Sequence, residues 1–457
     1  MSSPRRRRIS AGLVVVALLV AASCTKDEDE PSSNPGKSGD VSESIDDLLE
    51  DCPEGSETAG LDGDTIKLVS SYPQEGALAA FAEIAEGYNA YFDMVNEDGG
   101  VEVAGKKYKI EVEGFNDNYV PSETVEEING ALGPEGTDAF GTFSVVGTAN
   151  NIAIRKTLDT QCVPNIFAST GSPSMGNPEY PWTIGSSLPL YSTEASAFAE
   201  YLKTEKPDAT VAMLLQEGEY GDGYETSFTE AIKDTDITVV ATERYEAGLS
   251  TDVSAQVTKL ADTNADVFFN GATLLPCPQA LTKAAELGWE PIVYVSGTCA
   301  SKTLTGAAGP AAEGILSAPN LMDPNDPQWD SDERMTEYKD VVSAWKEKTG
   351  SDGSDPLNGV VGYGWTLAEL FVTALEQSDE MTRSSVLKSL NELDVTEPGV
   401  TFPGITVKTG KDDRFLGEAA IISQYSVDAT AFSPLDNDAI SDFEGGKGIP
   451  AELITAE

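Results

Sequence analysis

The chain has 457 residues, which at roughly 100–200 residues per domain corresponds to about two or three globular units. It carries 77 acidic and 29 basic side chains, a net charge of −48, so its overall field repels nucleic acid. The absence of histidine excludes Ser-His-Asp and Cys-His catalysis, histidine-ligated zinc and an imidazole pH switch. Apolar residues make up 40% of the chain, which supports a sizeable core and argues against global disorder.

The first 24 residues have the pattern of an export signal. Arginines occupy positions 5–8, a nearly continuous apolar run follows at 9–20, and small residues at 21–23 precede Cys24. The run is too short to span a membrane, and no other stretch is long and apolar enough. The pattern resembles a bacterial lipoprotein signal, which implies that residues 1–23 are removed and that Cys24 is diacylated. Ala21 departs from the pattern, where leucine is usual, and the competing interpretation is an ordinary signal peptide with an incidental cysteine.

Residues 24–60 are expected to form an acidic tether. The segment contains four consecutive acids at 27–30, followed by serine, proline and glycine, and it has almost no large apolar side chains. Charge repulsion and poor burial predict an extended, disordered and solvated segment. The body that follows is also acidic, and both an adaptation to high salt and a simple solubilising surface are compatible with this charge.

Strand and helix patterns alternate along the body in two runs. In the first run we expect strands at 66–71, 109–115, 139–143 and 163–167, and helices at 77–96 and 122–131. In the second run we expect helices at 193–203, 224–233, 253–261 and 278–287, and strands at 210–215, 238–242, 267–269 and 292–295. This alternation predicts parallel sheets covered by helices, in two α/β lobes.

Two stretches rich in proline separate these parts of the chain, at 181–189 and at 318–329. Three helices are expected after the second stretch, at 334–348, 360–377 and 382–393. Because no strand pattern separates them, they are expected to complete one lobe. The C-terminal part has short strand patterns at 404–408 and 419–423.

Several segments resemble the solute-binding proteins of ABC transporters, in the group that binds branched-chain amino acids. They are GYNAYFDMVNEDGG at 87–100, FNDNYVP at 115–121, YGDG at 220–223, AAEG at 311–314 and GYGWTLAELFVTAL at 362–375. Each is weak alone, and their order and spacing carry the resemblance, which covers roughly 65–390. It implies a type I periplasmic-binding fold, with two doubly wound parallel-sheet lobes joined by a three-strand hinge. On this basis lobe 1 is expected to comprise 61–185 plus 320–395, and lobe 2 to comprise 186–319 plus 396–457.

Polar residues that follow the predicted strands are the candidate ligand-binding residues, because ligands of open α/β sheets bind beyond the carboxyl ends of the strands. The resemblance implies that hydroxyl groups in these loops bind a ligand carboxylate and that a tyrosine of lobe 2 lines the cleft. Each hydroxyl also has the simpler interpretation of a helix N-cap, and each tyrosine that of a surface aromatic. The candidates are Tyr72, Ser144, Thr148, Ser169, Thr170, Tyr220 and Thr273.

One departure from the family concerns the ligand. Amino-acid binders of this group place an acidic residue after the strand that corresponds to 292–295, but this chain has Ser-Gly-Thr-Cys at 296–299. Leucine-like ligands are therefore in doubt. An amide, another small polar molecule, or an amino acid bound by Glu217, Glu219 or Asp222 remain as alternatives.

Four cysteines remain beside Cys24, and their even number in an exported protein favours disulfides, with three possible pairings. Without a CxxC spacing, a thiolate metal site has little support. Cys277 and Cys299 each follow a predicted strand by several residues, and consecutive parallel strands often neighbour each other. We therefore predict the pairs Cys52–Cys162 and Cys277–Cys299, against the alternative of four buried free thiols.

The function predicted from the sequence is that of an extracytoplasmic solute-binding protein, anchored by lipid to the outer face of the cell membrane. It is expected to capture a small polar solute and deliver it to the membrane subunits of an ABC permease, without a cofactor, a metal or a nucleic-acid partner. The alternative is a sensory or interaction lipoprotein with the same fold. An enzyme is disfavoured because the chain has neither a G-x-S-x-G motif nor a phosphate-binding loop, although a glycosidase that uses only carboxylates is compatible with the composition.

Overall fold

The computed structural model describes residues 48–456 apart from 134–135, 137, 247–251, 352–357 and 411–412. The predicted signal peptide, Cys24 and residues 25–47 of the predicted tether lie outside the described residues. Among the residues that are described, no helix has both the length and the apolar character that a bilayer crossing requires.

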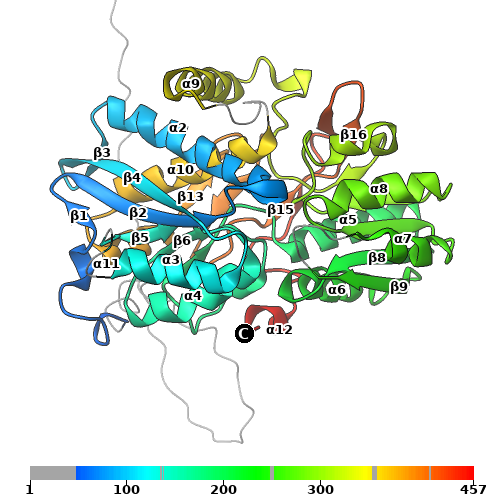
Figure 1. The fold of residues 1–457 in the computed structure, drawn as a ribbon, viewed down its shortest axis with the longest axis horizontal. Helices are drawn as coiled ribbons and strands as arrows, with labels where there is room; N and C mark the ends of the chain where they lie inside the picture. The colour runs from blue at the N-terminus through cyan, green and yellow to red at the C-terminus, as the bar shows by residue number, and fades with distance from the viewer. Residues whose placement is uncertain are drawn as a thin grey trace, which may run out of the picture. The chain divides into compact units, whose positions relative to one another are not determined.

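The first sheet lies in lobe 1 and is mostly parallel (Figure 1). Its strands are β1 (Leu61–Asp62), β2 (Thr65–Tyr72), β3 (Val101–Val103), β4 (Lys106–Asn116), β5 (Gly141–Phe143), β6 (Asn165–Ala168) and β7 (Thr183–Gly185). They follow the order β3-β4-β2-β5-β6-β7, with β1 beside β2, and only β1 and β3 pair in the antiparallel sense.

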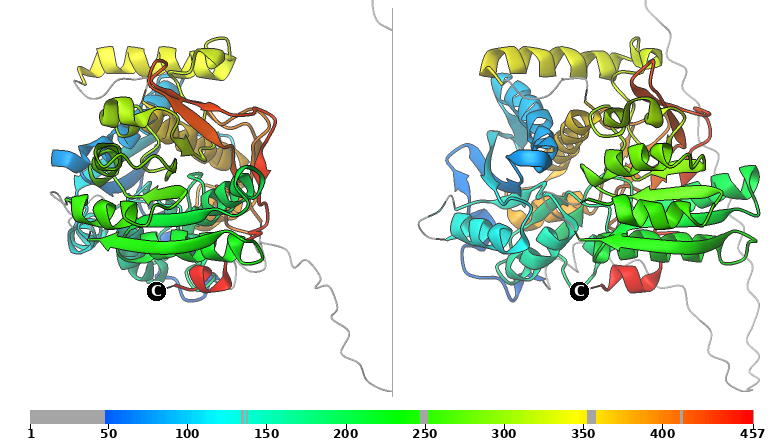
Figure 2. Two further views of the ribbon diagram at one scale, coloured as in Figure 1. Left: turned by 90° about the vertical axis from the view of Figure 1, so that its right-hand side faces the viewer. Right: turned by 45° about the vertical axis from the view of Figure 1, so that its right-hand side comes forward.

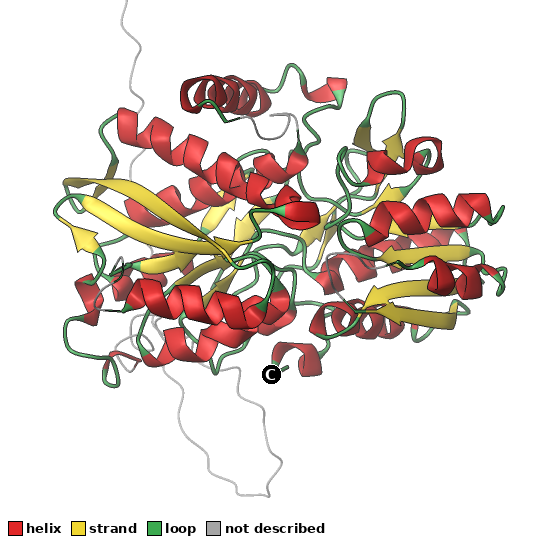
Figure 3. Ribbon diagram, viewed as in Figure 1, coloured by secondary structure: helices red, strands yellow, loops and turns green. Residues whose placement is uncertain are grey.

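Helices cover both faces of this sheet (Figure 3). One face packs on α2 (Glu83–Glu97), α10 (Gly359–Gln377) and α11 (Arg383–Leu390), and the other on α3 (Pro121–Leu132) and α4 (Thr148–Thr160). The alternation along β2 explains this, because Leu68 joins the first core and Val69 the second. Helices α2 and α10 approach so closely that a Cβ at Gly87 or Gly364 would overlap the backbone of the other helix.

The second sheet, in lobe 2, has the same plan. Its strands are β8 (Thr210–Gln216), β9 (Thr238–Tyr245), β10 (Val267–Gly271), β11 (Ile292–Val295), β12 (Leu316–Ser317), β16 (Ser423–Ser426) and β17 (Ala431–Pro434). Its helices are α5 (Tyr191–Glu205), α6 (Glu219–Ile232), α7 (Ser254–Ala261) and α8 (Pro276–Glu286). Met213 packs with α5 and α6 and Leu214 with α7 and α8, so both faces of β8 are buried, as its continuous apolar sequence predicts (Figure 2).

The strand order of the parallel part is the same in both lobes. In lobe 1 the order is β4-β2-β5-β6-β7, and in lobe 2 it is β9-β8-β10-β11-β12. Numbered within each lobe, both read 2-1-3-4-5, the doubly wound order in which ligands bind beside the carboxyl ends of the first and third strands. The predicted fold class is therefore correct, and the topology places a ligand crevice on each lobe.

Three segments cross between the lobes and lie side by side, at 186–190, 317–321 and 417–421, and we call them the crossing segments. The Asn320 side-chain amide donates a 2.6 Å hydrogen bond to the Ser187 carbonyl. The Leu190 N–H donates to the Gly417 carbonyl at 2.8 Å, and the Ile421 N–H donates to the Pro319 carbonyl at 2.9 Å. Each crossing segment is thus bonded to at least one of the others.

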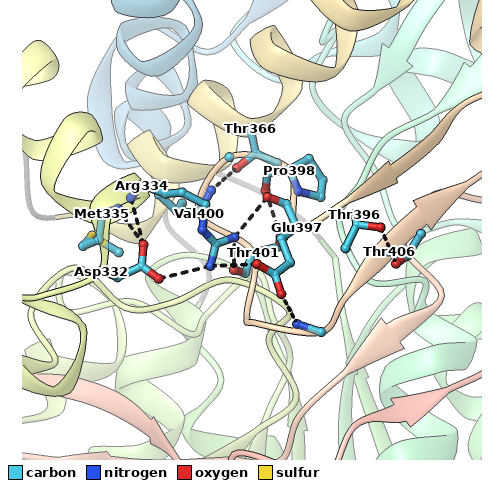
Figure 4. A network of polar contacts seen from close by, with 12 residues as sticks. Asp332, Arg334, Met335, Thr366, Thr396, Glu397, Pro398, Val400, Thr401 and Thr406 are labelled. Atoms are coloured by element: carbon cyan, nitrogen blue, oxygen red, sulfur yellow. Dashed lines mark hydrogen bonds and ion pairs between the residues drawn. The ribbon is translucent and has the colours of Figure 1, made fainter. Parts of the chain in front are cut away.

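A polar network links the beginning of α9 (Glu333–Thr349) to the turn at 397–401, as Figure 4 shows. The Arg334 guanidinium donates to the carbonyls of Glu397 and Thr401 at 3.0 and 3.1 Å, and it pairs with the Asp332 carboxylate at 3.2 Å. Asp332 also caps the first turn of α9 through the N–H groups of Arg334 and Met335. Thr401 in turn pairs with Leu321, so the network reaches the second crossing segment.

The structure also contains several shorter elements. They are η1 (Ser56–Thr58), η2 (Gly76–Ala82), η3 (Pro173–Gly176), η4 (Thr305–Ala312), η5 (Pro327–Trp329), β13 (Asp394–Thr396), β14 (Thr406–Lys408), β15 (Ala419–Ala420), β18 (Ser441–Asp442) and α12 (Ala451–Ile454). At a few places the packing differs from the tether and lobe boundaries expected from the sequence. Leu48 and Leu49, expected in the tether, pack against the lobe 1 core. Val407, expected in lobe 2, is buried in the same core, and Arg155 of lobe 1 donates to the Ala456 carbonyl at 2.8 Å.

Both predicted disulfides are confirmed. Cys52 bonds to Cys162 with 5.6 Å between the Cα atoms, and Cys277 bonds to Cys299 with 6.3 Å. The first bridge fastens the segment before β1 to the turn between α4 and β6, and the second joins the beginning of α8 to the loop after β11. The second bridge thereby fixes a loop at the carboxyl end of the lobe 2 sheet.

A carboxylate is fully buried in lobe 2. Glu194, in the first turn of α5, accepts hydrogen bonds from the hydroxyls of Tyr224 and Tyr294 at 2.9 Å and from the Gly297 N–H at 2.8 Å. Burial raises the pKa of Glu194 to about 7, although these three donors oppose the shift. The side chain fastens α5 to β11 and to the loop that follows it.

Removing the two disulfides separately should destabilise the protein by different amounts. Replacing Cys277 and Cys299 by serine opens a loop with a sequence separation of 22, and the chain-entropy model gives a loss of roughly 3 kcal/mol. Replacing Cys52 and Cys162 opens a separation of 110, for which the loss should be nearer 5 kcal/mol by the same model. Urea unfolding measures both values, and equal stability of the parent and both variants would contradict the expectation.

Glu194 should make stability depend on pH below neutrality. Its pKa is raised from 4.5 to about 7 in the folded protein, so unfolding releases a proton between these pH values, and the free energy of unfolding falls as the pH rises through them. Glu194→Gln lacks this group, and its stability relative to the parent should rise over the interval by on the order of 3 kcal/mol. Urea unfolding at stepped pH measures it. A difference that stays constant across the interval would count against a raised pKa.

Candidate functional site

A cavity of about 130 Å³ lies at the carboxyl ends of both sheets. Lobe 1, the crossing segments with the residues just after them, and lobe 2 all contribute to its wall. From lobe 1 come Phe81, Ile84, Tyr119, Val146, Gly147, Ser169, Thr170, Gly359, Val360 and Tyr363; from the crossing region come Leu188, Pro189, Pro319, Asn320, Leu321, Met322 and Asp323; and from lobe 2 come Tyr191, Tyr220, Thr273, Gly297, Thr298, Ala300, Ser301 and Phe432. A cavity of about 150 Å³ admits benzene, so this one has room for a small molecule.

Four of the predicted site residues line the cavity: Ser169, Thr170, Tyr220 and Thr273. They come from both lobes, although Tyr220 and Thr273 of lobe 2 lie 50 or more positions after the two lobe 1 residues in the chain, a separation of about four helix lengths. Tyr220 lies in the first turn of α6, because that helix begins at Glu219 rather than at the expected residue 224. These residues were candidates only because each follows a predicted strand, and the structure brings their side chains together in one cavity wall.

Two further predicted residues lie directly behind the wall. The Ser144 and Ser169 hydroxyls are 2.7 Å apart, and Thr148 and Thr170 form a second hydroxyl pair at 2.7 Å. Both Ser144 and Thr148 are buried. These pairs orient the two hydroxyls that reach the cavity, so Ser144 and Thr148 act on the site through Ser169 and Thr170.

Tyr72 does not line the cavity. Its ring lies against Gly114 of the neighbouring strand β4, where a Cβ would overlap the phenol. Burial raises the pKa of the Tyr72 phenol. The last residue of β2 therefore turns its side chain along the sheet rather than toward lobe 2.

The lobe 2 wall is held by a second set of hydrogen bonds. The Tyr220 hydroxyl is bonded to the hydroxyls of Ser296 and Thr298 at 3.0 and 2.8 Å. The Thr273 hydroxyl donates to the Gln216 side-chain carbonyl at 2.8 Å. The Ser-Gly-Thr segment after β11, which lacks the expected acid, thus positions the tyrosine.

Tyr191 is a wall residue that the sequence did not indicate. It begins α5 directly after the first crossing segment, and its hydroxyl lies 3.2 Å from that of Thr148 and 3.0 Å from that of Thr170. Its ring meets Tyr220 edge-on at 4.9 Å. Tyr191 therefore connects the lobe 1 hydroxyls to the aromatic side chains of the lobe 2 wall. Its place in the wall depends on the path of the chain between the lobes, which no local sequence pattern indicates.

Other aromatic side chains complete the enclosure. The rings of Phe81 and Tyr119 lie 6.0 Å apart and pack against the cores of both lobes. The Tyr363 hydroxyl is 3.1 Å from that of Ser169. Burial raises the pKa of the Tyr119, Tyr191, Tyr220 and Tyr363 phenols, so these groups are uncharged at neutral pH and serve as hydrogen-bond donors and acceptors.

The backbone is strained where strands end at the site. Ser144, Phe167 and Leu274 have φ values of 55°, 54° and 55°, in the left-handed region that bulky side chains rarely adopt. The Phe167 conformation coincides with a register shift between β6 and β7 and precedes the turn that presents Ser169. Such conformations cost free energy and concentrate at ligand sites.

Asp323 is the acidic residue of the wall, and in the part of the chain that the structure describes no lysine or arginine lines the cavity. Glu217, Glu219 and Asp222, the acids considered from the sequence, are not part of the wall, and Asp222 pairs with Arg244 at 2.8 Å. Burial raises the pKa of Asp323. The sequence did not indicate Asp323 because its Pro/Asp-rich surroundings resemble a linker.

The described part of the chain contains no cluster of three or more potential metal-ligating side chains. The described residues form a small enclosed site with many hydroxyls, several aromatic rings and one carboxylate. Such a site binds a molecule by hydrogen bonds and ring contacts, with orientation set by a few polar groups.

Comparison with known proteins gives consistent results. The leucine-, isoleucine-, valine-, threonine- and alanine-binding protein of Pseudomonas aeruginosa is 22% identical over 331 residues, covering 72% of this chain and 82% of the relative. A branched-chain amino-acid ABC transporter structure from Thermus thermophilus with bound valine aligns with a TM-score of 0.70 and 18% identity, covering 82% of this chain and 96% of that one.

A fatty-acid ABC transporter substrate-binding protein from Thermomonospora curvata aligns with a TM-score of 0.69 and 18% identity, covering 86% of this chain and 97% of that one. The family model for periplasmic binding proteins matches residues 65–429, which contain the crossing segments, the strands of both sheets except β1 and β17, and the residues of the cavity wall except Phe432. The chain therefore belongs to the periplasmic binding protein family, whose members bind solutes and are not enzymes.

Proposed function

We propose that this protein is an extracytoplasmic solute-binding protein that captures a small polar solute, such as an amino acid or an amide, and delivers it to an ABC permease. The observation that carries the proposal is the cavity at the carboxyl ends of both sheets, lined by hydroxyls of both lobes. Named relatives bind valine or other branched-chain amino acids, which supports a solute of similar size.

In this proposal Ser169 and Thr170 bind the solute from lobe 1, while Tyr220 and Thr273 bind it from lobe 2. Their hydroxyls are already oriented by Ser144, Thr148, Gln216 and the loop after β11, which lowers the entropic cost of binding. A solute that contacts both lobes stabilises the closed arrangement, and the permease recognises that closed form.

The anchor in this proposal is a diacyl group on Cys24. The arginine, apolar and small-residue order before Cys24 supports it, and the acidic segment that follows would hold the binding unit away from the membrane surface. The confirmed disulfides fit the same compartment, since such bonds persist outside the cytoplasm.

Substitutions in the cavity wall should weaken solute binding. Ser169→Ala and Tyr220→Ala each leave polar groups unpaired in a buried site, at a cost of about 1–3 kcal/mol, or roughly five- to 150-fold in affinity. A thermal-shift screen of amino acids, amides and small polar metabolites identifies the solute, because a ligand of the folded state raises the melting temperature.

Tyr72→Phe is the matched control for that experiment, because Tyr72 lies outside the cavity wall. Calorimetric titration with the best solute should give the parental affinity for Tyr72→Phe and a weaker one for both wall variants. Parental affinity in Ser169→Ala and Tyr220→Ala would exclude this cavity as the binding site.

Replacing Cys24 by serine should release the protein from the membrane. The parent should fractionate with membranes and carry a diacylated N-terminal cysteine, which mass spectrometry of the mature protein detects. The serine variant should appear in the soluble extracytoplasmic fraction with the same circular dichroism spectrum. A parent protein with an unmodified N-terminus at another residue would contradict the anchor.

A further inference from the structure

The charge of the cavity wall is negative. Among the described residues that line it, Asp323 is the single carboxylate, and neither lysine nor arginine is present. Transfer of a ligand carboxylate into this enclosed site would leave that charge without a cationic partner, which is costly away from water. A ligand cation, in contrast, would meet an opposite charge.

Four backbone donors of the lobe 1 wall are also occupied. The N–H groups of Val146 and Gly147 donate to the carbonyls of Ser71 and Ser169, and the N–H groups of Ser169 and Thr170 donate to other backbone carbonyls. These four groups belong to the lobe 1 wall, where a carboxylate would need such donors. They are already paired within the protein and offer nothing to an anion.

Asp323 is held in place and retains capacity to accept. Its Oδ1 accepts from the N–H and the side-chain amide of Asn325 at 2.9 and 3.1 Å, and its Oδ2 accepts from the Phe432 N–H at 2.9 Å. A carboxylate has about four acceptor sites, so three bonds leave one site, on Oδ2, for a ligand donor. The three protein donors fix the carboxylate, and burial limits its access to water.

Aromatic rings surround the same space. Phe432, whose backbone holds Asp323, lines the cavity together with Phe81, Tyr119 and Tyr191. The face of an aromatic ring attracts a cation within about 6 Å, most strongly when water is excluded. A cavity wall that combines one carboxylate with several aromatic rings favours an organic cation over a neutral molecule of the same shape.

We propose that the solute is a small organic amine, whose cationic group is bound by Asp323 and the aromatic wall, and that a ligand carboxylate is not required. This inference rests on the proposed function, because it assigns the chemical class of the solute to the same cavity. Asp323 is then the residue that determines the selectivity for charge.

Matched ligand sets test this proposal. The first set is leucine, 3-methylbutylamine, which lacks the carboxylate, and 4-methylpentanoate, which lacks the amine. The second is choline and its uncharged isostere 3,3-dimethylbutan-1-ol. Thermal shift and calorimetry at millimolar concentrations should show an amine binding at least tenfold more tightly than its uncharged or carboxylate counterpart.

Asp323→Asn keeps the shape of the side chain and removes its charge. It should weaken amine binding at least tenfold and leave the uncharged isostere unaffected. Asp330→Asn is the matched control, since it removes an exposed carboxylate that pairs with Lys339 outside the cavity. Should Asp323→Asn fold poorly, Phe432→Leu keeps the backbone donor to Asp323, and it should weaken binding of the amine more than that of the isostere.

The outcomes separate this inference from the proposed function. If 4-methylpentanoate or the uncharged isostere binds as tightly as the amine, if Asp323→Asn keeps the amine affinity, or if no amine binds, the inference is wrong. If leucine or 4-methylpentanoate binds more tightly than 3-methylbutylamine, and Tyr220→Ala abolishes that binding, the inference is overturned and the proposed function stands. Amine binding that Tyr220→Ala leaves unchanged would overturn both, because the ligand would occupy another place.

Discussion

The hydrogen bonds that join the three crossing segments are the constraint on which the rest of the structure depends. The Asn320 side chain, the Leu190 N–H and the Ile421 N–H tie together stretches of chain that are more than a hundred residues apart in sequence. Because the segments are bonded side by side, the two sheets meet with their carboxyl ends toward a shared space. The cavity wall includes residues of two crossing segments, so the joint between the lobes is itself part of the site.

Each lobe places the carboxyl edge of its sheet at the cavity, because the two sheets have the same strand order. The 2-1-3-4-5 strand order separates the loops after the first and third strands of each sheet and leaves a crevice between them. Disulfide Cys277–Cys299 and the buried Glu194 carboxylate hold the loops on the lobe 2 side. The paired hydroxyls behind Ser169 and Thr170 do the same on the lobe 1 side, so the wall is organised before a ligand arrives.

Much of the fold could be predicted from the sequence, because it is encoded by local patterns. The apolar runs of β8 and β10 and the helical spacing of α2 and α10 are visible without the structure. Serine and threonine after strand ends identified Ser169, Thr170 and Thr273 as wall residues, since the carboxyl edge of a parallel sheet is a general property of the fold. The Cys277–Cys299 pair followed from the same strand ends.

The remaining features depend on long-range geometry that no local pattern records. Tyr191 and Asp323 reach the cavity only because the chain crosses between lobes beside them, and Tyr72 misses it because the end of β2 lies against Gly114. The tether boundary was placed too late, since Leu48 and Leu49 find apolar partners in lobe 1 that are distant in sequence. The alternation of apolar and polar residues along a strand predicts which face of the sheet a side chain occupies. It does not predict which residues of the other lobe lie opposite that side chain.

The central claim is that one small solute is enclosed between the lobes, in contact with both of them. A crystal structure of the protein with the solute that stabilises it most is the most direct measurement. The account predicts ligand density in this cavity, within hydrogen-bond distance of Ser169 or Thr170 on one side and of Tyr220 or Thr273 on the other. Ligand density outside the cavity, or in contact with one lobe only while the other remains solvated, would contradict it.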